Sequence, residues 1–457
     1  MRRAGRVVAA VVAWGSACGA EPPPWRAGEA LGLPSWLRVG LEHRERVERL
    51  SSDFRAGSPG GVTALSLRTR LVAEARGAAV TAGVELVDAR AFATRDSALN
   101  TTIVDPLDVL QAYAGLRGAS VLIDGDAASV KAGRFTIDLG SRRLVARNDY
   151  RNTINGFSGV DATWRSPAGH ALRALVVTPV TRLPSSPAAL ADARLARDRE
   201  SSGAVLWALA LSSASIAGRA RVESYVIGLG ERDTPAVPSA DRRLVTPGAR
   251  VVVAPSPGAL DGELEVMGQL GTSRASSAAS DHRELRHRAA SVHAEVGLLA
   301  AAPLRPRLAL LLDAASGDRD PSDGVNGRFD PLFAARRFDF GPTGLWGVLA
   351  RSDLASPGAR VQLEPLSTVG VVATYRAAWL ASARDAWAAA GVRDRAGDSG
   401  AFIGHVVDAR ARWSPVPGNV AIEIGAAALA RGRFAREAEG GRDGTPLYAY
   451  AQVVGTI

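Results

Sequence analysis

The stretch SLRTRLVAEAR, residues 66–76, alternates strictly between two kinds of side chain. On an extended chain the more polar face holds Ser66, Arg68, Arg70, Val72, Glu74 and Arg76. The opposite face holds Leu67, Thr69, Leu71, Ala73 and Ala75. A period of two predicts a β-strand that buries one face in a different environment from the other.

The same alternation recurs along the whole chain. It is clearest in residues 262–270, 287–298 and 405–413, and it also marks 37–47, 219–226, 305–313 and 421–428. Many strands of this kind, joined by turns rich in Gly, Pro, Asp and Ser, predict a β-sandwich or a β-barrel. At about 24 residues per strand and turn, the chain holds about 16 to 18 strands, with 18 favoured.

The polar face favours the barrel. A sandwich turns that face to bulk water, whereas a transmembrane barrel turns it into a lumen and presents small and aliphatic residues to lipid. We therefore expect an all-β protein with a single transmembrane antiparallel β-barrel over residues 35–457. Longer breaks near 183–202, 231–247, 315–345 and 383–401 are expected to be extracellular loops. Tight turns such as APLRP, residues 302–306, are expected to be periplasmic.

The N-terminus has the pattern of an export signal. Arg2, Arg3 and Arg6 precede a short apolar run, and small residues follow up to Ala20. The run is too short to span a bilayer, so we expect a signal peptide over residues 1–20 that is cleaved after Ala20. Lipidation of Cys18 and the absence of processing are the alternatives. Residues 21–34 would then form a short periplasmic segment, and the mature chain would have no cysteine.

The positive charge is almost entirely arginine. The formal net charge is +9, and Lys131 is the only lysine in the chain. The 46 acidic residues are scattered among the arginines, so no block of one sign predicts nucleic-acid binding. The planar guanidinium group of arginine can donate two parallel hydrogen bonds to a carboxylate or a phosphate.

Several of these arginines are expected to face the lumen. The stretch GRFTIDLGSRRLVARNDYRNTINGF, residues 133–157, gathers five of them. Alternation counted from Lys131 assigns Arg134, Thr136 and Asp138 to the polar interior. The predicted pore-lining and substrate-binding residues are Arg68, Arg70, Arg134, Asp138, Arg142, Arg143, Asp161, Asp408, Arg410 and Arg412.

Residues 130–164 resemble the alginate export family of outer-membrane β-barrels. The family pattern has a Gly-Arg pair, a glycine and an arginine, an asparagine-bearing turn and a Phe-x-Gly strand. Its counterparts here are Gly133, Arg134, Gly140, Arg142 or Arg143, Asn152 or Asn155, Phe157 and Gly159. Residues 315–341, with Gly317, Asp318 and the run Phe329–Phe333, and residues 400–434, with Gly404, Asp408, Gly425, Gly432 and Phe434, resemble it too. The family's glutamine after the Gly-Arg pair is Phe135 here.

The resemblance implies a monomeric barrel of about 18 strands that exports an anionic polysaccharide through an arginine-lined constriction. It also implies partners: the polysaccharide or small anions, the outer-membrane lipid and periplasmic polymer-synthesis or export proteins. No cofactor is implied. An outer-membrane porin that takes up small anions or other solutes is the first alternative, and a secreted soluble β protein that binds acidic polymers is the second.

Other motifs predict no enzyme. The sequence GDSG at residues 397–400 lacks the histidine motif that a protease would need, and the six histidines show no zinc spacing. Ser291 with His287 and His293 is a weak candidate for catalysis. Asp318, Asp320 and Asp323 form a weak candidate for a calcium loop. The chain ends at Ile457, whereas outer-membrane barrels usually end in an aromatic residue.

Overall fold

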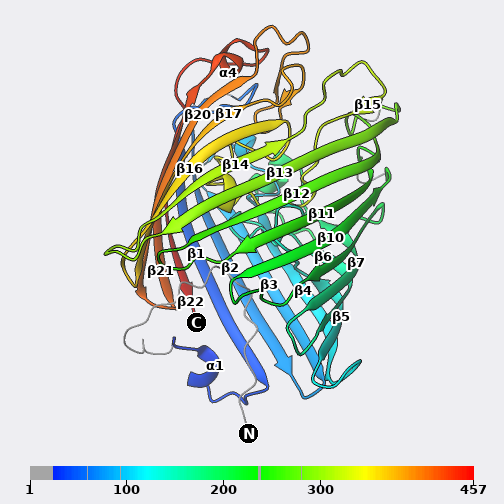
Figure 1. Ribbon diagram of the computed structural model, residues 1–457, viewed down its shortest axis with the longest axis vertical. Coiled ribbons are helices and arrows are strands. Elements are labelled where there is room, and N and C mark those ends of the chain that lie inside the picture. The colour runs from blue at the N-terminus through cyan, green and yellow to red at the C-terminus, as the bar shows by residue number, and fades with distance from the viewer. Residues whose placement is uncertain (1–23, 59, 93, 235–237, 279) are drawn as a thin grey trace.

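The computed structural model describes residues 24–58, 60–92, 94–234, 238–278 and 280–457. The predicted signal peptide therefore lies outside the described residues. The chain forms a closed antiparallel barrel of 18 strands with very little helix (Figure 1). The predicted fold class is confirmed, and so is the favoured strand number.

The wall is built from long strands in sequence order. The first nine are β1 (Leu37–Leu50), β2 (Val62–Arg76), β3 (Val80–Phe92), β4 (Asp105–Ala119), β5 (Ala127–Phe135), β6 (Phe157–Arg165), β7 (Ala171–Thr181), β9 (Ala204–Ser212) and β10 (Ala220–Glu231). The other nine are β11 (Arg243–Val253), β12 (Leu260–Ser273), β13 (Leu285–Leu299), β14 (Arg307–Ala315), β16 (Leu354–Leu366), β17 (Val369–Trp379), β20 (Phe402–Val416), β21 (Val420–Arg431) and β22 (Leu447–Thr456).

Short elements decorate the loops. Four two-residue strands are β8 (Arg199–Glu200), β15 (Val325–Asn326), β18 (Ala386–Trp387) and β19 (Val392–Arg393). The helices are α1 (Ala27–Ala30), η1 (Asp96–Ala98), α2 (Pro187–Ala191), α3 (Arg337–Phe340) and α4 (Arg433–Glu437). Among the described residues, no helix has the length and apolar character needed to cross a membrane.

Pairing of the first and last strands closes the barrel. β1 pairs with β2 on one side and with β22 on the other, where Glu42 lies opposite Thr456 and Leu50 opposite Tyr448. Closure leaves no free sheet edge, which is the condition for placing strands in lipid. The terminal Ile457 continues this seam, because its backbone exchanges hydrogen bonds with Leu41.

The predicted alternation separates the two faces of the wall. The outward side chains of β14 and β12 are apolar and exposed, as at Leu310 of β14 (71%) and Val266 of β12 (47%). Asp261 and Glu265 of β12 point inward and are buried. The outer surface is therefore a band of aliphatic side chains, and the inner surface carries the charge. This is the distribution expected when lipid surrounds the barrel and water fills it.

The two ends of the barrel differ. One end has short turns, at 77–79, 120–126, 166–170, 213–219, 254–259, 300–306, 367–368 and 417–419, and β1 starts and β22 finishes there. The helix α1 lies near this short-turn end, and the Trp25 amide donates to Asn419 Oδ1 at 2.8 Å (Figure 1). The other end carries long loops, including 136–156, 182–203, 316–353 and 380–401. We call it the long-loop end.

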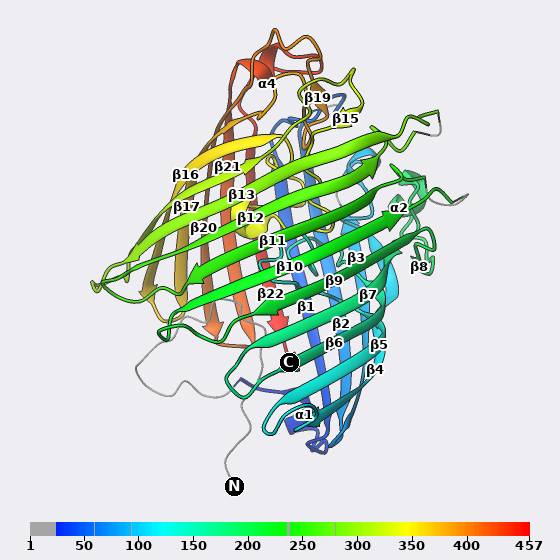
Figure 2. The same ribbon diagram turned by 45° about the vertical axis from the view of Figure 1, so that its right-hand side comes forward.

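Two of these long loops fold into the barrel instead of standing above it. We call them the first inner loop, residues 136–156, and the second inner loop, residues 327–353. They pair with each other: the Phe333 amide donates to Leu144 O at 2.8 Å, and the Ala146 amide donates to Phe333 O at 3.1 Å. The yellow segment that contains α3 is visible behind β12 and β13 (Figure 2).

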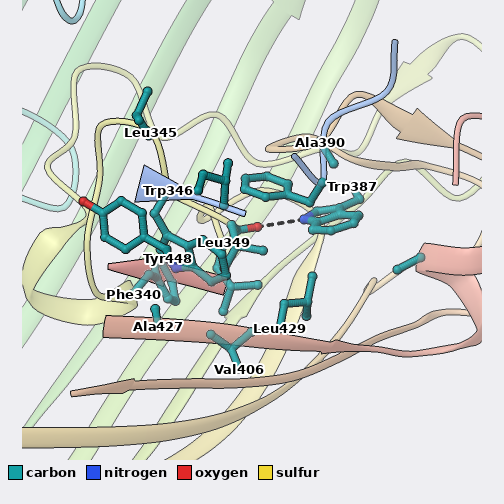
Figure 3. Close-up of a cluster of buried hydrophobic side chains, with 14 of the residues drawn as sticks. Phe340, Leu345, Trp346, Leu349, Trp387, Ala390, Val406, Ala427, Leu429 and Tyr448 are labelled. Carbon is teal, nitrogen blue, oxygen red and sulfur yellow. Dashed lines mark hydrogen bonds between the residues drawn. The ribbon is translucent and has the colours of Figure 1, made fainter. Parts of the chain in front are cut away.

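An apolar cluster fixes the second inner loop to the wall. Trp346 stacks on Tyr448 of β22, with ring centroids 5.8 Å apart, and Trp387 donates its indole N–H to Val348 O at 2.8 Å (Figure 3). Both indole rings are almost fully buried. Burial of two tryptophans and the leucines around them supplies much of the free energy that keeps the loop inside the barrel.

The first inner loop has its own apolar core, which corrects one expectation. Strand β5 ends at Phe135, so Thr136 and Asp138 lie in the loop and not on the strand. Phe135 and Phe157 are both completely buried in a cluster with Leu144 and Val177. The alternating pattern predicted that the strand continues through Asp138. Instead the chain leaves the wall after Phe135 and turns inward, because this packs the Phe135 ring against the loop and removes it from water.

A glycine on β21 lets an aromatic ring lie flat on the inner wall. A Cβ on Gly425 would come within 2.5 Å of the Tyr450 ring, and the Tyr450 hydroxyl donates to Glu423 at 2.6 Å. We predict that Gly425→Val lowers barrel stability by about 1–3 kcal/mol, the usual cost of overpacking. The measurement is the temperature at which the folded band disappears in semi-native gel electrophoresis.

Gly370→Val on β17 is the matched control, because nothing lies within 4 Å of a Cβ at Gly370. This variant should melt with the parent. Equal melting of the Gly425 variant and the parent would contradict the packing described for Tyr450.

Candidate functional site: the arginine-lined lumen

Inward arginines of β1 and β2 hold the first inner loop by its backbone. Arg44 donates to the carbonyls of Asp149, Tyr150 and Arg151, and Arg68 donates to Asp149 O at 2.8 Å. Both arginines are about 2–3% exposed. Among the described residues, no backbone amide donates to these three carbonyls, so the guanidinium donors satisfy groups that would otherwise be left unpaired.

Arg143 connects the two inner loops to the opposite wall. Its guanidinium donates two hydrogen bonds to Asp339 of α3, at 2.9 and 3.0 Å, and one to Glu265 of β12 at 2.8 Å. It also pairs with Glu263 of β12. Arg143 is 3% exposed, so this bidentate contact operates with little competition from water.

A second group of charges lies beside it. Asp313 of β14 pairs with Arg351 at 2.7 Å, with Arg376 at 2.8 Å and with His293 at 2.9 Å. In the described part of the chain, His293, Asp313 and Asp339 are the one group of potential metal ligands whose atoms come within 4.8 Å of one another. Guanidinium groups already occupy both carboxylates and would repel a cation, so we interpret the group as an anchor for the second inner loop.

Other inward arginines have no such partner. Within the described residues, five of them make no ion pair or side-chain hydrogen bond: Arg38, Arg165, Arg221, Arg410 and Arg412. Most of them lie toward the short-turn end. A cavity of about 300 Å³ under the first inner loop is lined by Arg165 and Arg221 together with Tyr225. Many of the paired arginines thus connect the inner loops to the wall, and the unpaired ones lie on the inner face of the wall, most of them toward the short-turn end.

The structure brings several predicted site residues together. Arg68 and Arg70 of β2 share Glu42, and Arg70 also pairs with Glu85 at 2.9 Å. Asp161 of β6 accepts from Arg173 at 2.8 Å and lies 3.5 Å from Lys131.

The remaining predicted residues lie in the first inner loop or on β20. Arg142 lies over the Phe338 ring at 4.7 Å, and Asp138 is exposed and accepts the Arg147 amide at 2.9 Å. Asp408 of β20 is buried on the inner face, in line with Arg410 and Arg412. A Cβ on Gly341 of the second inner loop would lie 3.0 Å from its carboxylate.

Arg134 does not face the lumen, and its predicted orientation was wrong. In the sheet, Gly133 of β5 lies opposite Tyr113 of β4 and Gly159 of β6, and Lys131 lies opposite Asp161, which points inward. Residues that lie opposite each other on neighbouring strands share a face, so Lys131 and Gly133 are on the inner face of β5. Arg134 takes the outer face and pairs with Glu200 of β8 at 2.7 Å. Because Phe135 points inward, as described above, the neighbouring Arg134 must point outward.

The acidic loop residues do not converge on a calcium site. Asp320 accepts the Ser322 amide at 3.0 Å, and Asp323 accepts the Val325 amide at 2.7 Å, each within its own turn. Asp318 lies beside Asp385 instead. The catalytic alternative is not supported either: the Ser291 hydroxyl donates to Ala314 O, and His287 bonds to Gln269 and Ser273.

The model of the family described as alginate export matches residues 35–446, nearly the whole barrel. The chain belongs to the alginate export family. No curated protein matches the sequence. The resemblance first drawn from residues 130–164, 315–341 and 400–434 is therefore confirmed over residues 35–446.

Solved structures with the same fold are outer-membrane proteins of Pseudomonas aeruginosa. OccK2 (OpdF), solved in complex with glucuronate, is 12% identical, with a TM-score of 0.57, and the match covers 92% of this chain and 98% of that one. OccK9 (OpdG) is 13% identical with a TM-score of 0.58 and the same coverage. The outer membrane protein OpdK is 12% identical with a TM-score of 0.56. At these identities the likeness establishes the fold.

Family and fold together show that this alginate export family member is an outer-membrane channel and not an enzyme. From the general rule that bacterial outer-membrane barrels have short periplasmic turns and longer extracellular loops, we assign the short-turn end to the periplasm and the long-loop end to the cell exterior. Sequence reasoning missed the anchor residues Asp313, Asp339 and Arg351. Asp339 and Arg351 lie in the second inner loop, where no periodicity is available to assign them to a face.

Removing the charge of Asp339 tests the anchor. Asp339→Asn removes one of the carboxylates that pair with the buried Arg143 and Arg351. Breaking a buried ion pair typically lowers the free energy of unfolding by about 3–5 kcal/mol. We predict that the second inner loop detaches while the barrel stays folded, so that single-channel conductance rises. Asp192→Asn, in an exposed pair with Arg194, is the control and should leave conductance unchanged. A parent-like conductance in both variants would contradict the anchoring role.

Asp353, just before β16, gives a prediction about pH. Burial and the neighbouring Asp385 charge raise the pKa of Asp353 to about 7. Its Oδ1 accepts the Ser382 amide at 2.7 Å, and its Oδ2 has no hydrogen-bond partner among the described residues. The folded loop therefore binds a proton that an unfolded aspartate, with a pKa of about 3.9, releases. Loop stability should fall as the pH rises from about 4 to about 7.

Hydrogen exchange of the Ser382 amide, corrected for intrinsic rate, measures this effect. Protection should be greater at pH 5 than at pH 7.5 in the parent. Asp353→Asn keeps the acceptor oxygen and removes the titration, so its protection should be the same at both values. An unchanged pH dependence in the variant would assign the effect to another group.

Proposed function

We propose that this outer-membrane channel exports an anionic polysaccharide of the polyuronate class and selects it electrostatically. One observation carries the proposal: five arginines face the lumen and make no ion pair with a carboxylate among the described residues. An inward guanidinium of this kind is free to bind a carboxylate of the substrate. Arginine rings that line a pore select anions in this way.

The charge distribution along the pore supports passage as well as binding. Arg410 and Arg412 project from one strand, with Asp408 next to them and Glu423 opposite Arg412 on β21. The neighbouring carboxylates reduce the depth of the potential well, because conduction needs sites that release the ion as easily as they take it up. Repeated carboxylates of a polymer can then move from one arginine to the next.

The position of the unpaired arginines supports export. Arg38, Arg165 and Arg221 lie at or next to the strand ends of the periplasmic face, where a polymer made inside the cell arrives. The inner loops, which are held to the wall by the paired arginines, lie further along the lumen. An electrostatic approach of this kind raises the local concentration of an anionic substrate. The alternative of a porin for small anions shares the same arginines and differs in its response to the polymer.

Planar-bilayer recording tests the proposal. The mature chain should give an anion-selective reversal potential under a salt gradient, and polyuronate added on the periplasmic side should block the current. The double variant Arg410→Ala/Arg412→Ala should lower the anion-to-cation permeability ratio several-fold and weaken the block about tenfold or more, since each lost guanidinium–carboxylate contact is worth about 1.5–3 kcal/mol.

The control is Arg49→Ala/Arg288→Ala, which removes the same charge from the outer face of β1 and β13. It should conduct like the parent. Anion selectivity with no response to polyuronate would favour the small-anion porin. Equal loss in both double variants would show that net charge, and not the lumenal arginines, sets the selectivity.

A further inference from the structure

A cluster of arginines on the outer surface of the barrel has no role in the lumen. Alternation in β13 buries Leu285 and His287 on the inner side, so Arg286 and Arg288 point outward, and both are exposed. On β11 the inward neighbour Leu244 is 2% exposed, which puts Arg243 on the outer face as well. Nothing in the transport mechanism uses these side chains.

Strand register brings the three arginines together. Arg243 of β11 lies opposite Thr272 of β12, and Thr272 lies opposite Arg286 of β13. At a strand spacing of about 4.8 Å, the Cα atoms of Arg243 and Arg286 are about 10 Å apart. Arg288 is two residues along β13, about 7 Å away. Guanidinium groups on side chains of this length can converge on one anion.

Two of the three arginines are free to do so. Arg243 already lies near carboxylates, with Asp241 at 3.3 Å and Glu284 at 3.8 Å. Within the described residues, Arg286 and Arg288 make no ion pair or side-chain hydrogen bond. Exposed arginine pairs with solvent-facing carboxylates contribute little, so Arg243 can also exchange its partner.

The cluster lies at the edge of the apolar outer band. The next outward row toward the periplasm contains Val245 and Leu270, which are 42% and 56% exposed, directly beside Arg288. Below them Val266 and Leu264 continue the apolar surface down β12. Arg243, Thr272 and Arg286 lie at the extracellular ends of their strands, so the cluster is level with the headgroups of the outer leaflet.

We propose that Arg243, Arg286 and Arg288, with the Thr272 hydroxyl, form a binding site for a phosphate-bearing glycolipid headgroup of the outer leaflet. Guanidinium groups fork onto phosphate oxygens, and arginines at a bilayer surface are attracted to anionic lipid. The acyl chains of the same lipid lie against Val245, Leu270 and Val266. One molecule therefore satisfies the charged cluster and the apolar surface beneath it.

Native mass spectrometry of the full chain tests the site. The protein, in detergent, is titrated with a bis-phosphorylated, acylated glucosamine disaccharide. The same lipid without phosphates and inorganic phosphate alone form the two comparison arms. We expect retained adducts with the phosphorylated lipid only. Arg286→Ser/Arg288→Ser should lower its affinity about tenfold or more, because each arginine near an anionic headgroup contributes a factor of about five.

The charge-matched control is Arg319→Ser/Arg395→Ser, which removes two exposed arginines from extracellular loops. It should bind the lipid like the parent, and both double variants should keep parent-like conductance and melting. Equal affinity in the two double variants would overturn the proposal. Equal binding of the lipid without phosphates would overturn it as well, because contact with the acyl chains alone would then explain the adduct.

Discussion

The constraint on which the structure depends is the need to neutralise charge inside the barrel. Eighteen strands give a lumen that must be filled or lined, and the inner faces of many of those strands carry buried arginines and carboxylates. The two inner loops bring the complementary charges. Arg143 and Asp339 are the centre of this arrangement, since each is almost fully buried and bonds to the other loop and to the wall. Without their pairing, each of these two buried groups would lose one of its opposite charges, which is costly in a buried site.

This constraint also explains why the chain uses arginine where lysine would carry the same charge. Arg44 and Arg68 each donate to several backbone carbonyls at once, and Arg143 reaches three carboxylates. A lysine ammonium offers no planar fork and is more strongly hydrated, so it would not hold these geometries as well. The arginine-rich composition thus serves two purposes. Many lumenal arginines hold the inner loops to the wall, and a smaller set makes no ion pair within the described residues and is proposed to bind the substrate.

Sequence alternation predicted the wall of the barrel well, and it failed where the chain leaves the wall. Residues 66–76 gave the correct inner face, and Arg68, Arg70, Arg410 and Arg412 all point into the lumen as expected. Arg134 was assigned to the wrong face because the pattern was counted through Phe135 and Ile137 as if they met lipid, whereas both are buried inside. Partners such as Asp339 and Arg351 lie in an irregular loop, and only the folded chain brings them to Arg143.

We infer that the second inner loop, held by these ion pairs, narrows a lumen whose wall still selects anions. Single-channel conductance of a chain in which residues 328–351 are replaced by a short glycine-serine linker tests it most directly. We expect a several-fold larger conductance that remains anion-selective, because Arg410 and Arg412 stay on β20. A conductance equal to that of the parent would contradict it, since the loop would then not form the constriction.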